Sequence, residues 1–189
     1  MNDDLHNEIG RIRKVSQDAD CLATEQEVAQ AFDEMACAIT EPLKDKLPVV
    51  YCVMSGGMFA TSELLKRLDF PLEVDYLHAT RYRRKTEAGD LHWRVEPEVA
   101  MKGRSVLIID DILDEGATLV AILEHCQAQG AKEVTCAVLV DKQHNRKAVD
   151  GFTADFTGLF IEDRYLFGCG MDYQGYLRNL PAIYAPKGL

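Results

Sequence analysis

One stretch decides the fold: Ser105-Val106-Leu107-Ile108-Ile109-Asp110-Asp111-Ile112-Leu113-Asp114-Glu115-Gly116-Ala117-Thr118. Its first part is rich in β-branched residues and predicts a strand over residues 105–110. Its second part is acidic and reaches Gly116, and a helix is expected from about Leu119 to Gln129. A strand that runs through a short acidic turn into a helix predicts an α/β protein.

The same order recurs on both sides of this stretch. A capping box at residues 24–27 predicts a helix that Pro48 ends. The apolar run Val49–Met54 suits a strand buried on both faces, and Ser55-Gly56-Gly57 separates it from a helix over residues 59–68. Further elements are expected as strands over 72–78, 134–140 and 156–161, a hairpin arm over 91–95, a loop over 80–90 and irregular chain beyond 163. The alternation predicts a parallel sheet flanked by helices, with ligands at the carboxyl ends of the strands.

Composition excludes several classes of protein. The 189 residues contain 31 acidic and 21 basic side chains, and the net charge of −10 disfavours nucleic acid or an anionic membrane as partner. No apolar run approaches the roughly 20 residues of a membrane span, and the acidic N-terminus is unlike a signal peptide. The six cysteines are scattered without a CxxC pair, so we expect free or buried thiols and a cytoplasmic location.

The acidic turn is the first candidate site. Asp110, Asp111 and Asp114 repel one another unless a partner neutralises them, and adjacent carboxylates suit vicinal sugar hydroxyls or a magnesium ion. The N–H groups of residues 115–118 open a helix and favour an anion such as phosphate. Together these features point to a sugar phosphate, although a solvated acidic loop is the simpler alternative. The DDxxD spacing also matches the motif of isoprenoid synthases, but that motif belongs on a helix and here it ends a predicted strand.

Four segments resemble one family in order and spacing. Residues 106–118 resemble the phosphoribosyl-pyrophosphate loop of type I phosphoribosyltransferases. Residues 54–57, 140–142, and 163–168 with 171–173 resemble the pyrophosphate loop, the purine-lysine segment and the base-stacking segment of the hypoxanthine-guanine branch. The resemblance implies a single domain over 1–189, with a core of about 46–150 and a small hood from about 1–45 and 151–189. It also implies a dimer or tetramer.

The resemblance further implies that a purine base is joined to phosphoribosyl pyrophosphate with Mg²⁺, giving IMP or GMP and pyrophosphate. Asp110 and Asp111 would hold the ribose 2- and 3-hydroxyls, one of them also facing a magnesium shell, and Asp114 would be the general base near purine N7. Backbone N–H groups and one hydroxyl would cradle the 5-phosphate, from Glu115, Gly116, Ala117 and Thr118. Gly56 and Gly57 would lie in the pyrophosphate loop.

The remaining roles concern the base, the second magnesium and a lid. Lys142 would donate to the purine 6-oxo group and so reject adenine, Tyr165 would stack on the base, and Leu166 would offer backbone groups. Asp172 would ligate the second magnesium, and Arg178 would pair with pyrophosphate. The basic run 81–85, with Arg81 and Tyr82, lies where the family carries a mobile lid. The plainer alternatives are a solvated lysine, a core tyrosine, a surface arginine and a solvated charge run.

Some positions depart from the family pattern. Ser55 replaces a longer residue before Gly56, and Glu115 and Ala117 replace a threonine and a basic residue in the phosphate loop. We expect the Glu115 side chain to face away from the phosphate while its N–H faces in. His78, His92, His125 and His144 lack metal-ligand spacing and receive no site role. Two alternatives stay open: a nucleotide-sensing regulator on the same fold, and a xanthine-preferring phosphoribosyltransferase.

Overall fold

The computed structural model describes residues 2–81 and 91–188, with only the backbone of residues 2, 3, 81 and 91. The helices are α1 (Asn2–Asp18), α2 (Glu25–Leu43), α3 (Gly57–Leu65) and α4 (Ala117–Ala128). The strands are β1 (Asp20–Ala23), β2 (Val49–Val53), β3 (Glu73–Arg81), β4 (Leu91–Val95), β5 (Ser105–Leu113), β6 (Glu133–Gln143), β7 (Phe156–Glu162) and β8 (Ile183–Ala185).

Six strands form the main sheet in the order β4-β3-β2-β5-β6-β7. The five strands β3, β2, β5, β6 and β7 pair in parallel, and β4 is added antiparallel to β3 at one edge. The predicted fold class, a parallel sheet flanked by helices, is therefore confirmed, as is the hairpin arm at β4. The carboxyl ends of β2, β5 and β6 lie side by side, which brings the loops after Val53, Leu113 and Gln143 together.

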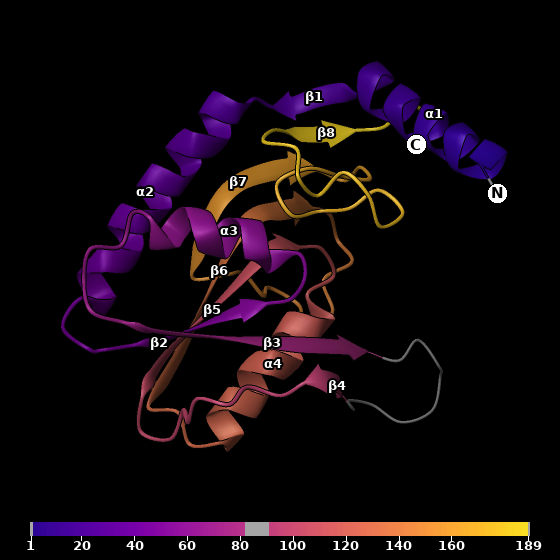
Figure 1. Cartoon of the computed structure of the whole chain (residues 1–189). Coiled ribbons are helices and arrows are strands. Elements are labelled where there is room, and N and C mark those ends of the chain that lie inside the picture. The colour runs from indigo at the N-terminus through magenta and orange to yellow at the C-terminus, as the bar shows by residue number, and fades with distance from the viewer. Residues whose placement is uncertain (1, 82–90, 189) are drawn as a thin grey trace.

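Each face of the sheet has its own hydrophobic core. α2 and α3 cover one face, where they bury Val50, Leu107 and Leu139 (Figure 1). α4 covers the other face, where it packs on Tyr51, Ile108 and Val138. Successive residues of β2 and β5 alternate between the two cores because neighbouring side chains of a strand point to opposite faces.

Several element boundaries differ from the prediction. α2 ends at Leu43, before Pro48, and Pro42 in its last turn lacks the N–H that would bond to the Ala38 carbonyl oxygen. The predicted capping box is confirmed: Thr24 Oγ1 accepts from the Glu27 N–H, and Glu27 Oε2 accepts from the Thr24 N–H. β5 and β6 each run three residues further than predicted, since Ile112 pairs with Val140 and Leu113 with Asp141.

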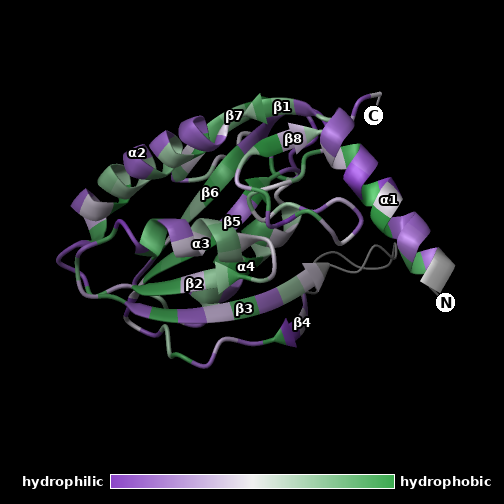
Figure 2. Ribbon diagram, turned by 45° about the horizontal axis from the view of Figure 1, so that its top comes forward, coloured by the Kyte–Doolittle hydropathy of each residue, from purple (hydrophilic) through white to green (hydrophobic). Residues whose placement is uncertain are grey.

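The segments near the two ends of the chain hold elements that the sequence analysis did not predict. β1 pairs antiparallel with β8, although the chain beyond Asp163 was expected to be irregular. Arg164 joins them, because its Nη2 lies 2.9 Å from Asp20 Oδ2 and 3.0 Å from the Pro186 carbonyl oxygen. α1 lies beyond the main sheet on the side of β1 and β8 and alternates hydrophilic with hydrophobic residues (Figures 1 and 2).

The β3–β4 hairpin forms the other edge of the sheet. Thr80 and Arg81 were predicted to be loop, but they extend β3 because they pair with His92 and Leu91. Trp93 of β4 lies against α4, with its ring centroid 4.7 Å from that of His125. Across residues 2–81 and 91–188, none of the helices combines the length and the apolar character needed to cross a bilayer.

Candidate active site

Several of the predicted site residues fall into two neighbouring clusters at the carboxyl ends of β2, β5 and β6. The carboxylate cluster contains Asp110, Asp111, Asp172 and Arg178, and the backbone of Gly56 and Gly170 encloses it. The second, which we call the Asp114 network, contains Asp114, Lys142, His144, Arg146 and Asp163.

Glycines allow the backbone to approach the carboxylate cluster closely. A Cβ on Gly56 would overlap the Asp111 carboxylate, and a Cβ on Gly57 would lie 2.5 Å from the Ile109 carbonyl oxygen. Gly170 has φ +103°, and a Cβ there would overlap the carbonyl oxygen of Gly56. The loop after β2 and the segment after β7 therefore meet over Asp111 only because these positions have no side chain.

The adjacent carboxyls of Asp110 and Asp111 influence each other's pKa. Asp111 is 7% exposed, and Asp110 Oδ1 accepts a hydrogen bond from the Asp111 N–H at 2.9 Å. Burial raises the pKa of Asp110 well above its usual value, and the charge of Asp111 raises it further. Burial also raises the pKa of Asp111, against the opposing effects of Asp110 hydrogen bonding and the Arg178 charge. The pair therefore favours a bound cation or hydrogen-bond donors.

Arg178 is the cation that faces this pair. Its Nη2 lies 2.6 Å from Asp172 Oδ1, and its Nη1 donates to the Gly170 carbonyl oxygen at 2.6 Å and lies 3.9 Å from Asp111 Oδ2. Asp172 Oδ2 also accepts from the Gly175 N–H at 2.7 Å. The structure thus places Asp172 and Arg178 together beside Asp111, rather than leaving Arg178 as an isolated surface charge.

The loop between β5 and α4 presents free N–H groups. Gly116 has φ +79° and precedes the first residue of α4, Ala117. The first helical hydrogen bond is donated by Val120 to the Gly116 carbonyl oxygen, so the N–H groups of residues 117–119 have no partner within the helix. The Glu115 side chain is 64% exposed and lies 3.8 Å from an Arg146 nitrogen. This arrangement can bind an anion.

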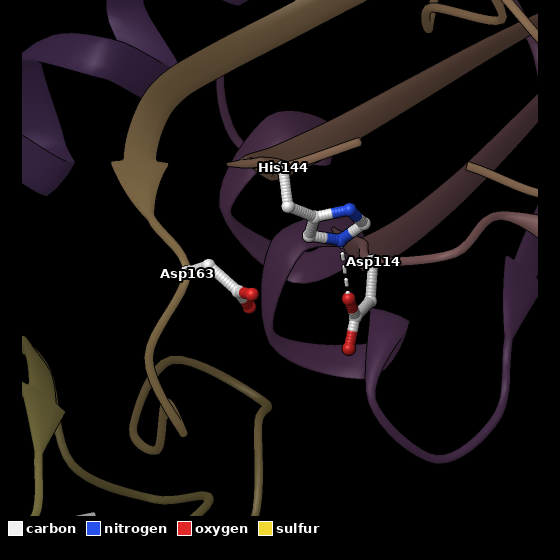
Figure 3. A group of neighbouring side chains, drawn as sticks. All are labelled: Asp114, His144 and Asp163. Atoms are coloured by element: carbon white, nitrogen blue, oxygen red, sulfur yellow. Dashed lines mark hydrogen bonds and ion pairs between the residues drawn. The ribbon is translucent and has the colours of Figure 1, made fainter. Parts of the chain in front are cut away.

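Asp114 is held by donors on two sides. Asp114 Oδ2 lies 3.1 Å from Lys142 Nζ, and Asp114 Oδ1 lies 2.7 Å from His144 Nε2 (Figure 3). Burial alone would raise the pKa of the Asp114 carboxyl. The hydrogen bonds from His144 and Lys142 outweigh burial, and the pKa lies below its usual value. Asp114 is therefore a carboxylate that stays ionised.

Lys142 is buried rather than solvated. Its side chain is 10% exposed, and its Nζ lies 3.4 Å from Asp163 Oδ1 as well as near Asp114. A buried ammonium between two carboxylates can donate to a polar atom of a ligand that enters beside them.

The segment after β7 offers an aromatic face. Tyr165 is 44% exposed and makes an edge contact with Tyr173, with ring centroids 5.8 Å apart. Leu166 is buried, at 6% exposure. Tyr165 is therefore a surface aromatic rather than a core residue, in keeping with a stacking role. The side chain of Arg81 and all of Tyr82, predicted as parts of a lid, lie outside the described residues.

Several members of the Asp114 network were not predicted from the sequence. Arg146 makes two hydrogen bonds to Asp163, at 2.8 and 2.7 Å, and His144 contacts Asp114. One signal was available, because residues 143–146 directly follow Lys142 at the end of β6. Gly170 was also missed, and only the approach of two distant segments reveals its role.

A sheet of this topology with an acidic strand end, an anion-binding helix start and a buried lysine defines a nucleotide- or sugar-phosphate-handling α/β protein. The phosphoribosyl transferase domain family matches residues 18–174, and the chain belongs to this family.

The relatives also specify the branch. The chain is 35% identical to a hypoxanthine-guanine-xanthine phosphoribosyltransferase of Tritrichomonas foetus over 162 residues, covering 86% of this chain and 88% of the relative. It is 32% identical to the hypoxanthine-guanine phosphoribosyltransferase of Bacillus subtilis, covering 86% and 89%. A solved hypoxanthine phosphoribosyltransferase from Staphylococcus aureus superimposes with a TM-score of 0.85 at 30% identity, covering 91% of this chain and 94% of that chain. The resemblance to the hypoxanthine-guanine branch is confirmed.

Proposed function

We propose that this protein joins hypoxanthine or guanine to 5-phosphoribosyl pyrophosphate and releases pyrophosphate, which salvages purines as IMP or GMP. The observation that carries the proposal is the pairing of Asp114 with buried Lys142 beside the anion-binding start of α4. A proton acceptor, a donor for a 6-oxo group and a phosphate cradle thus lie next to one another.

In this reaction the C1–O bond to pyrophosphate breaks as the bond from C1 to purine N9 forms. Asp114 takes the proton from purine N7, so that the base becomes neutral in the product. Asp110 and Asp111 accept hydrogen bonds from the ribose 2- and 3-hydroxyls and stabilise the positive charge that develops on the ribose ring. The N–H groups of Glu115 to Thr118, with the Thr118 hydroxyl, bind the 5-phosphate, and Gly56 and Gly57 let backbone approach the pyrophosphate.

Lys142 donates to the purine 6-oxo oxygen, Tyr165 stacks on the base, and the backbone of Leu166 meets its edge. An amino group at the 6-position would oppose the ammonium with a second donor, so adenine is rejected. Arg178 pairs with pyrophosphate, while Arg81 and Tyr82 belong to the lid that closes over it.

Magnesium fits the residues present. Asp110, Asp111 and Asp172 supply hard carboxylate oxygens, and burial, which raises the pKa of both Asp110 and Asp111, disfavours their charged forms unless a cation binds. One of Asp110 and Asp111 would face one magnesium ion and Asp172 would hold a second, and these ions would supply charge neutralisation for the pyrophosphate that leaves.

We also propose one domain over residues 1–189, with a core of about 46–150 and a hood from about 1–45 and 151–189. The β1–β8 sheet supports this division, because it draws one strand from each end of the chain and is separate from the main sheet. The six cysteines are free, as in a reducing compartment, which supports a cytoplasmic location. A homodimer or homotetramer is the proposed assembly.

A direct assay tests the function. Purified protein, Mg²⁺ and phosphoribosyl pyrophosphate are mixed with hypoxanthine, guanine, xanthine or adenine, and nucleotide formation is followed. Turnover is expected with hypoxanthine and guanine and not with adenine. Xanthine is included because one 35% identical relative carries that base in its name. Absence of turnover with both hypoxanthine and guanine overturns the proposal.

A further inference from the structure

His144 is a buried imidazole that takes no part in the proposed reaction. Its side chain is 4% exposed, and its Nε2 lies 2.7 Å from Asp114 Oδ1. It follows the end of β6 directly, on the same segment as Lys142, and points at Asp114 (Figure 3).

A second contact fixes which ring nitrogen carries the proton. The backbone N–H of Arg146 donates to His144 Nδ1 at 3.0 Å, so Nδ1 is an acceptor without a proton. The proton of a neutral imidazole must then lie on Nε2, which donates to Asp114. Protonating both nitrogens would set Nδ1–H against the Arg146 N–H. The backbone therefore favours Nδ1 as the acceptor and Nε2 as the donor.

The charges around Asp114 come from three segments. Lys142 on β6 contacts Asp114 Oδ2, Arg146 in the following loop lies 3.9 Å from Asp114 Oδ1, and Glu115 beside it is 64% exposed. Asp163, after β7, binds Lys142 and Arg146 rather than Asp114. Ligand atoms of Asp114, His144 and Asp163 lie within 4.8 Å of one another. A metal is nevertheless disfavoured there, because Nε2 carries a proton and the two cations already neutralise the carboxylates.

We propose that His144, with Nε2 as donor, is a positioning residue that holds Asp114 in its orientation and keeps it ionised while a purine binds. The inference rests on the proposed function of Asp114 as general base. When Lys142 donates to the purine 6-oxo group, its hold on Asp114 Oδ2 weakens and that oxygen is free to accept a proton. His144 keeps its hydrogen bond to Oδ1, so the carboxylate does not turn away.

His144→Leu and His144→Gln test this role against the wild type. Leucine removes the donor, whereas the glutamine amide can restore one near Nε2. The dependence of kcat/KM on pH is measured from pH 3 to 8 for hypoxanthine at saturating phosphoribosyl pyrophosphate. In His144→Leu the acid limb of the pH profile is expected about one pH unit higher than in the wild type. At pH values below that limb, kcat/KM should therefore be about tenfold lower than in the wild type. His144→Gln is expected to recover most of this loss, and the KM for phosphoribosyl pyrophosphate should stay unchanged. An unchanged acid limb in a folded, active His144→Leu protein overturns the proposal.

A second measurement does not depend on turnover. In the ¹⁵N spectrum of the wild-type protein, the His144 signals are identified by their loss in His144→Gln. They are expected to show a proton on Nε2, and a neutral ring whose proton lies on Nδ1 instead contradicts the proposal. Should no purine be turned over by any variant, the proposed function fails, while this spectrum still decides the state of His144.

Discussion

Asp114 has three cationic or donor groups within 4 Å, from Lys142, His144 and Arg146. Asp114→Asn preserves its size but removes its ability to take a proton. Turnover should fall by about 10²–10⁴, the usual contribution of a general base. GMP binding, followed by calorimetry, should persist. A variant that keeps the wild-type rate shows that Asp114 is not the base.

Asp110 makes the ligand-free protein sensitive to pH. Its pKa is raised in the folded state by burial and by the charge of Asp111, so the native state binds a proton that the unfolded chain has lost. Stability present at low pH is therefore lost as the pH rises from about 4 through the raised pKa. Asp110→Asn should therefore be more stable than the wild type at pH 8.

Thermal unfolding in the presence of a chelator, at pH 4 and pH 8, measures this effect. The gain in stability of Asp110→Asn over the wild type should vanish at pH 4, where the wild-type carboxyl is protonated. A gain of equal size at both pH values would mean that the charge is not its cause.

Gly170 should not tolerate a side chain. Alanine would combine the unfavourable φ of +103° with an overlap against the Gly56 carbonyl oxygen, for a loss of at least about 3 kcal/mol. Gly103→Ala is the matched control: its φ is +73° and no atom lies within 4 Å of its added Cβ, so only about 1 kcal/mol should be lost. Urea unfolding of both variants compares them, and equal losses would rule out the overlap as the cause.

At the scale of residues, the sequence predicted groups whose chemistry is visible in one local pattern. Asp110, Asp111 and Asp114 crowd a strand end, and Lys142 ends another strand, so both could be found without coordinates. His144 and Gly170 could not be assigned in this way. Their partners, Asp114 and Gly56, are brought to them only by the packing of distant segments.

Among the elements, those with a strong apolar period or a cap were predicted, as α2 and β5 illustrate. β1 and β8 were missed because they are only four and three residues long, and each is stabilised by the other. α1 was missed because its apolar positions are few and Leu5 and Ile9 remain exposed.

A buried ion pair joins the loop after β6 to β6 itself, and the same lysine bonds to the last residue of β5. Lys147 Nζ lies 2.7 Å from Asp141 Oδ1 and donates to the Leu113 carbonyl oxygen at 2.9 Å, and Asp141 is 4% exposed. Lys147→Met leaves that carboxylate buried without its cation and should cost about 3–5 kcal/mol in urea unfolding.

The double variant Asp141→Asn with Lys147→Met should recover most of this loss, because no charge then remains unpaired. Lys14→Met, on an exposed face of α1, is the control and should change stability by less than about 0.5 kcal/mol. A double variant as unstable as Lys147→Met would show that the ion pair is not what fastens the loop.

For the whole molecule, the net charge of −10 does not indicate the proposed phosphate-binding site. Phosphate binding is compatible with this net charge because helix N–H groups and the cations Lys142, Arg146 and Arg178 are placed within an acidic surface. Charge summed over the chain therefore describes which large partners are repelled, and the local arrangement decides which small ligand is bound.

GMP should stabilise the whole fold, because its proposed contacts come from both the main sheet and the segment after β7. At 100 times its Kd, GMP adds about 2.7 kcal/mol, equivalent to a rise in Tm of roughly 5–10 °C. AMP should give a much smaller rise, because its 6-amino group cannot accept from Lys142. Equal shifts in a thermal scan would contradict the proposed role of Lys142.

The contact between Trp93 and His125 has a practical consequence for optical experiments. Trp93 is the only tryptophan of the chain, and it lies on β4, at the edge of the sheet opposite β7 and the segment that carries Tyr165. Its fluorescence emission therefore reports on the β3–β4 edge and not on the base. A change in emission when phosphoribosyl pyrophosphate is added without a purine would time the movement of that edge in a stopped-flow instrument, with no label attached to the protein.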